Sequence, residues 1–141
     1  MSNRTYRLAS ATGPGVEAPL LVCPRPFSAR YDLDRRTGVI SREGHPLQGQ
    51  SVVGTILVSP GVQGGVAAGW ALLAMRGLGV GFAGLVFGDV NPVMVQGAVT
   101  AGIPIAAGLD PSALDELQSG ALARLDPGTR TLTLLGLRSF T

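Results

Sequence analysis

The sequence predicts a single α/β domain in which helices alternate with buried strands. Three observations carry this prediction. Apolar runs rich in β-branched residues alternate with helix-like segments from residue 52 onward. Asn-Pro and Asp-Pro pairs, which open helices, follow two of these runs. The chain has 141 residues and no linker-like stretch, so we expect one domain spanning residues 1–141.

The first third of the chain is expected to be rich in strands. Tyr6–Ala9 is predicted to form an edge strand, and Leu20–Cys23 a short buried strand that ends at a proline. Residues 25–50 are polar and rich in turn residues, which predicts a long loop of the kind that often carries function. Within this loop the turn Asp34–Gly38 precedes a short strand at Val39–Ser41. The prediction is a separate small sheet packed against the rest of the domain.

The remainder of the chain is predicted to form a parallel α/β unit with short right-handed crossovers. The expected strands are Val52–Val58, Phe82–Phe87, Ile103–Ala107 and Arg130–Leu137. The expected helices run from Gly64 to Met75, from Pro92 to Ala101 after the cap Asn91, and from Pro111 to about Ser119. In the first helix, Val66, Trp70 and Leu73 recur at helical spacing and predict its buried face. Trp70 and Met75 are accordingly expected in the core or at an interface.

The charge pattern favours a domain that is partly covered by a partner, because only 14% of its residues are charged. All eleven basic residues are arginines. Four of them, Arg30, Arg35, Arg36 and Arg42, fall in one segment and predict either a solvated loop or recognition of a carboxylate or phosphate. The small basic excess disfavours nucleic acid. The apolar stretch 90–109 is interrupted by prolines and amides, which disfavours a membrane span.

Cysteine usage indicates a reducing compartment. Cys23 is the only cysteine, so it makes no internal disulfide and cannot by itself hold zinc or an iron–sulfur cluster. We expect a buried thiol, no metal or cofactor held by this chain, and a cytoplasmic location, since the N-terminal residues lack an apolar signal core.

A glycine-rich turn over residues 59–69 joins the first strand of the α/β unit to its helix. Backbone N–H groups at a helix start form an anion site, here predicted at Gly64, Gly65 and Val66. The turn has no Lys, His or Cys, and its only hydroxyl is Ser59 on the strand side. The sequence therefore predicts one half of a site whose reactive groups belong to another chain.

The long loop supplies the other candidate residues. His45, the only histidine, marks either a locally packed turn or a general base. Asp34 and Thr37 indicate a capped turn, and Asp32 with Asp34 is an alternative candidate for paired carboxylates. Tyr31, by its position in the chain, is a candidate hydrogen-bond donor near the site.

Two stretches resemble the aconitase X small subunit. The first runs from Ser28 through Asp34-Arg-Arg-Thr37-Gly38 and His45-Pro-Leu-Gln-Gly49 to the strand before the turn; the second is Val90–Pro104. The resemblance implies a swivelling β/β/α domain, with a sheet, flanking helices and a smaller β layer. It also implies a larger partner subunit that carries an iron–sulfur cluster, together forming a hydro-lyase such as cis-3-hydroxyproline or phosphomevalonate dehydratase. The implied substrate-binding residues are Ser28, Arg30, Asp34, Thr37, Gly38, His45, Gly64, Gly65 and Val66.

The sequence departs from that family at two places. The family's turn serine, thought to take part in proton transfer, aligns with Gly65, so no catalytic residue is carried over to this chain. A family Phe-Trp-Gly-Gly segment is replaced by Ala29–Asp32. A second hypothesis is therefore a non-catalytic binding or assembly module of the same fold. A phosphohistidine domain is excluded because no His follows the paired glycines.

Overall fold

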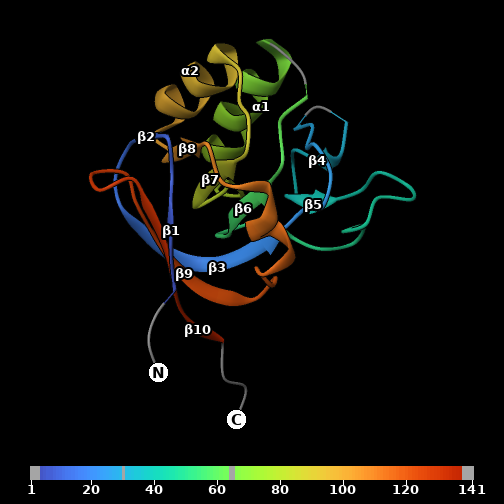
Figure 1. The fold of residues 1–141 in the computed structure, drawn as a ribbon. Coiled ribbons are helices and arrows are strands. Elements are labelled where there is room, and N and C mark those ends of the chain that lie inside the picture. Colours follow the sequence, from blue (N-terminus) through green and yellow to red (C-terminus); the bar gives the residue numbers. More distant parts are fainter. Residues whose placement is uncertain (1–3, 30, 64–65, 138–141) are drawn as a thin grey trace.

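The computed structural model describes residues 4–29, 31–63 and 66–137. Its centre is a run of four parallel strands in the order β3 (Val16–Val22), β6 (Ile56–Ser59), β7 (Gly84–Phe87) and β8 (Ile105–Ala107). The helices α1 (Val66–Gly77) and α2 (Pro92–Ala101) connect the last three of these strands and cover one face of the sheet (Figure 1). The carboxyl ends of these strands thus point toward the starts of both helices.

The N-terminal strands close the sheet on itself. β1 (Thr5–Arg7) pairs with β10 (Thr131–Leu137), which pairs with β9 (Ala121–Asp126), which pairs with β3. At the other end β2 (Ser10–Thr12) pairs with β8. Only Leu8 and Ala9 separate β1 from β2, and their N–H groups donate to the carbonyls of Arg130 and Ala107, both at 2.9 Å. Residues 5–12 therefore pair with both ends of the sheet and form a barrel, which leaves no long unpaired edge.

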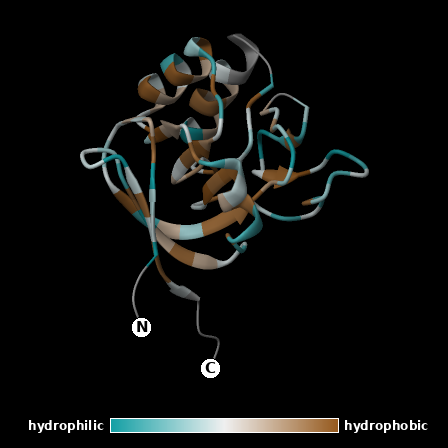
Figure 2. Ribbon diagram, in the orientation of Figure 1, coloured by the Kyte–Doolittle hydropathy of each residue, from teal (hydrophilic) through white to brown (hydrophobic). Residues whose placement is uncertain are grey.

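The central strands are apolar on both faces because each face is buried. Leu21, Leu57, Leu85 and Ile105 are aligned across the four strands and face the helices. Their neighbours point into the barrel, where a second core forms from residues such as Leu20, Ile56, Val86 and Leu125. In Figure 2 the central strands and parts of both helices are coloured as apolar. Two buried faces explain why the strands are continuous apolar runs rather than alternating ones.

The long loop between β3 and β6 packs on the helix-side core. Within its described residues, the strands form a small separate sheet, β4 (Leu33–Asp34) with β5 (Val39–Ile40). Leu33, Ile40 and Leu47 are buried in the same core cluster as Leu72 and Met75 of α1. This segment is therefore a fixed part of the domain.

Several predictions about the elements were wrong. The predicted small sheet of the first third does form, but only from β4 and β5, since β1, β2 and β3 join the main sheet. The strand expected from Val52 begins at Ile56, because Val52–Thr55 turns back on itself with the Thr55 N–H on the Val52 carbonyl. β9 was not predicted at all. The third helix is a short 3₁₀ helix, η1 (Pro111–Asp115).

The buried face of α1 also differs from the prediction. Ala71, Leu72 and Met75 are fully buried, whereas Trp70 is 65% exposed. Gly69 of α1 and Gly97 of α2 let the two helices approach closely, and Trp70, the residue after Gly69, lies at the surface. Within the described residues, no helix is long and apolar enough to cross a membrane.

Candidate functional site

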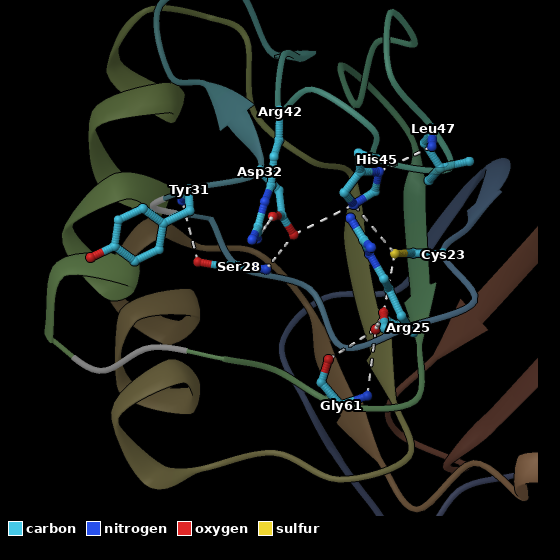
Figure 3. Close-up of polar contacts among 10 residues, drawn as sticks. Cys23, Arg25, Ser28, Tyr31, Asp32, Arg42, His45, Leu47 and Gly61 are labelled. Carbon is cyan, nitrogen blue, oxygen red and sulfur yellow. Dashed lines mark hydrogen bonds and ion pairs between the residues drawn. The ribbon is translucent and has the colours of Figure 1, made fainter.

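The carboxylate of Asp32 lies at the centre of a buried polar cluster in the long loop (Figure 3). Its Oδ2 accepts the N–H of Ser28 at 2.8 Å and lies 3.5 Å from Nε2 of His45. Its Oδ1 accepts Nη1–H of Arg42 at 3.0 Å. The Asp32 carbonyl also accepts the N–H groups of Ser41 and Arg42. One buried residue therefore joins segments 28–32 and 41–45, which turns an irregular stretch into a defined shape.

His45 is a neutral, buried side chain whose tautomer follows from its contacts. The N–H of Leu47 donates to Nδ1 at 3.0 Å, so the ring proton belongs on Nε2, which faces Asp32. Burial lowers the pKa of the His45 imidazole, Asp32 opposes this, and the guanidinium groups of Arg25 and Arg42 lower it further. The predicted locally packed turn is confirmed.

Cys23 lies close to His45 without forming a catalytic pair. Its sulfur is 3.9 Å from Nε2, the same nitrogen that faces Asp32. A proton relay of the Cys-His-Asp type needs the two partners on different ring nitrogens, and here Nδ1 is occupied by a backbone N–H. Burial also raises the pKa of the Cys23 thiol, which keeps it protonated and poorly nucleophilic.

Two buried side chains fix the chain where β3 ends. The thiol of Cys23 lies 3.1 Å from the Arg25 carbonyl, and the hydroxyl of Ser59 lies 2.9 Å from the same oxygen. Ser59 is fully buried. The one hydroxyl on the strand side of the glycine-rich turn is thus a structural anchor.

The loop and the glycine-rich turn pair directly with each other. The N–H of Phe27 donates to the carbonyl of Gly61 at 3.0 Å, and the N–H of Gln63 donates to the carbonyl of Phe27 at 2.8 Å. Beside this pairing lies a cavity of about 430 Å³, lined by Pro26 and by residues 60–63 and 89–91. Ser28 and its cluster therefore lie next to the residues that lead into α1.

The start of α2 is closed by its own cap. Oδ1 of Asn91 accepts the N–H of Met94 at 2.8 Å, as the Asn-Pro pair predicted.

This geometry can be compared with known proteins. A family model described as the aconitase X swivel domain matches residues 5–134. The chain belongs to that family. The phosphomevalonate dehydratase small subunit of Methanopyrus kandleri is 32% identical over 113 residues, which are 80% of this chain and 84% of the relative. That of Pyrococcus abyssi is 28% identical over 121 residues, 86% of this chain and 91% of the relative.

A solved structure shows the same fold as this aconitase X swivel domain. The crystal structure of Thermococcus kodakaraensis aconitase X in its holo form matches with a TM-score of 0.86 at 23% identity, covering 94% of this chain and 98% of that chain. The predicted fold class, a mixed sheet with flanking helices and a smaller β layer, is confirmed.

The structure of this swivel domain places the predicted site residues in two groups. Ser28 and His45 belong to the cluster around Asp32. Asp34, Thr37 and Gly38 form the predicted turn, in which Oδ1 of Asp34 accepts the Arg36 N–H at 2.8 Å and Gly38 has a left-handed φ of 75°. Asp32 and Asp34 are not paired with each other, since each carboxylate has its own cationic partner.

The remaining candidates in the swivel domain stay predictions. Arg30, Gly64 and Gly65 lie outside the described residues, and of Val66 only the backbone, at the start of α1, is described. The sequence reasoning missed the roles of Asp32 and Arg25. One available signal was the aspartate that stands at position 32 where the family pattern has a glycine.

Proposed function

We propose that this chain is the small subunit of an aconitase-X-type hydro-lyase. In this role it covers the active site of a larger iron–sulfur subunit and helps to bind a hydroxy substrate that bears a carboxylate or phosphate. The match of residues 5–134 to the swivel domain carries the proposal. Relatives that are named phosphomevalonate dehydratase small subunits support it, and they favour a phosphorylated substrate.

The side chains of this chain indicate which parts of the reaction belong to the partner subunit. His45 and Cys23 are buried and engaged with structural partners, so neither is positioned to reach a substrate. Among the described residues, no three His, Cys, Asp or Glu side chains gather as a metal site. The donors for a cluster, and the groups that remove water from the substrate, are therefore assigned to the partner. We place this pair in the cytoplasm, where a lone buried thiol stays reduced.

A second candidate is a binding or assembly module that kept the fold and lost the chemistry. The observation that favours it is Gly65, which stands where the family has a serine. Glycine has no side chain to give or take a proton.

The test is reconstitution. We would purify the chain with the cysteine-rich large subunit encoded beside it and follow loss of water from phosphomevalonate by mass spectrometry. The proposal expects turnover by the pair and none by this chain alone. A Gly65→Ser variant separates the two candidates. If the wild-type pair is stable but inert and the Gly65→Ser pair turns over, the result supports the binding or assembly module. If both pairs are inert on phosphorylated and on plain hydroxy acids, the hydro-lyase function is rejected.

A further inference from the structure

Two arginines approach the polar cluster around Asp32. Arg42 reaches Oδ1 of Asp32 from the segment after β5, and Arg25 extends from the end of β3 toward His45 (Figure 3). Both guanidinium groups are close enough to His45 to disfavour its charged form. Because His45 is thereby kept neutral, these four side chains carry two positive charges and one negative charge. The excess positive charge has no partner among them, which makes an anion a complementary ligand.

Arg42 is held in place before any ligand arrives. Its N–H donates to the Asp32 carbonyl at 3.2 Å, its own carbonyl accepts the His45 N–H at 3.1 Å, and its Nη1 donates to Oδ1 of Asp32. Even so, half of the side chain is exposed to solvent. A guanidinium has five N–H donors in a rigid fork, so most of them remain for a ligand. A group that is already ordered loses little entropy on binding.

The ion pair of Arg42 with Asp32 lies next to the candidate site. The same Asp32 carboxylate accepts the N–H of Ser28, and the adjacent Phe27 pairs with residues 61–63 of the glycine-rich turn. The side chain of Arg36 offers a contrast, since it is 88% exposed and its ion pair is with Asp34 in its own turn.

We propose that Arg25 and Arg42 form a binding site for an oxyanion, a carboxylate or a phosphate monoester, and that Asp32 is the positioning residue that orients Arg42. The identification of this anion with the charged group of a substrate rests on the proposed function. Asp32 lowers the net positive charge of the site, yet it increases affinity because it fixes the fork of Arg42 toward the ligand.

The test is an NMR titration of the full chain with inorganic phosphate, and separately with acetate, against sodium chloride at matched ionic strength. We expect saturable shifts of the Arg25 and Arg42 Nε–H signals and of the Ser28 amide. Arg42→Gln should weaken phosphate binding at least tenfold, whereas Arg36→Gln, which removes the same charge from the same loop, should change it less than twofold. If Arg42→Gln fails to fold, Arg42→Lys keeps the charge without the fork and should weaken binding severalfold. Stronger binding of phosphate than of acetate would assign the site to a phosphate monoester, and the reverse to a carboxylate.

The change in anion affinity caused by Asp32→Asn distinguishes a positioning role from a purely electrostatic one. Removal of a negative charge should tighten anion binding if charge alone matters, but it should weaken binding if Asp32 orients Arg42. The site is rejected if no signal saturates or if Arg36→Gln weakens binding as much as Arg42→Gln. The positioning role is rejected if Asp32→Asn tightens binding. Because no partner is present in this titration, its failure is distinguishable from failure of the reconstituted pair to release water.

Discussion

Gly97 of α2 packs directly on Gly69 of α1, and a β carbon added to Gly97 would lie only 2.5 Å from the Gly69 α carbon. No real contact is this short, so the two helices would have to separate. Gly97→Ala should lower the free energy of unfolding by about 1–3 kcal/mol, because overpacking outweighs the better helix propensity of alanine. Urea unfolding measures the change.

The matched control for this substitution is Gly77→Ala at the end of α1. A β carbon there meets no atom within 4 Å. Gly77→Ala should leave the free energy of unfolding unchanged or raise it slightly. Equal losses in the two variants would contradict close packing of the helices.

Gly38, one of the predicted site residues, combines two constraints. Its φ is 75°, and a β carbon would lie 2.6 Å from Cγ2 of Val53 and 3.0 Å from the Val80 carbonyl. Gly44 has a similar φ of 78° with open space around it. Gly44→Ala should therefore cost about 1 kcal/mol for the left-handed backbone alone, whereas Gly38→Ala should cost at least twice as much. Similar thermal midpoints for the two variants would contradict the crowded site at Gly38.

The orientation of α1 can be tested at two of its apolar residues, one buried and one exposed. Leu72 is fully buried and Trp70 is mostly exposed. Leu72→Ala should cost about 2–5 kcal/mol, and Trp70→Ala less than about 1 kcal/mol. In the unmodified chain, acrylamide should quench the fluorescence of Trp70, the only tryptophan, efficiently. A protected tryptophan would instead support the face that the apolar spacing predicted.

The buried imidazole of His45 should make stability depend on pH. Its pKa in the folded chain is lowered from 6.5, so the unfolded chain binds more protons below neutral pH. The free energy of unfolding should therefore be highest above about pH 7 and fall as the pH drops through 6.5, with a slope of at most about 1.4 kcal/mol per pH unit for one proton.

The control for the pH effect is His45→Asn. Asparagine keeps an acceptor for the Leu47 N–H but does not titrate. His45 is the only histidine in the chain, so this variant should flatten the dependence between pH 7 and pH 5.5. The groups that face the ring, Asp32, Cys23, Arg25 and Arg42, remain in both proteins. An unchanged slope would show that His45 is not the titrating group.

The elements that the sequence predicted well are those with local signals. Asn91 and Pro92 open α2, and Gly102, with a φ of 72°, ends it as a left-handed cap. β9 could not be predicted in this way, because Ala121–Asp126 is composed largely of helix formers and becomes a strand only through pairing with β3 and β10.

The same distinction applies to the candidate site. The turn at Asp34 and the local packing of His45 follow from neighbouring residues, and the sequence favoured both. The role of Asp32 depends on partners ten and thirteen residues away, Arg42 and His45, which meet only after the loop has folded onto the helix-side core. Contacts at that separation have no local pattern to reveal them.

The closure of the barrel by residues 5–12 has a consequence for biosynthesis. Thr5 ends up beside Thr133, 128 residues later in the chain. Residues 5–12 leave the ribosome before both of their partner strands, so their pairing must wait until β8 and β10 have been made. Until then the nascent chain exposes two strand edges at once, so substitutions that weaken the pairing of residues 5–12 should lower the yield of folded protein.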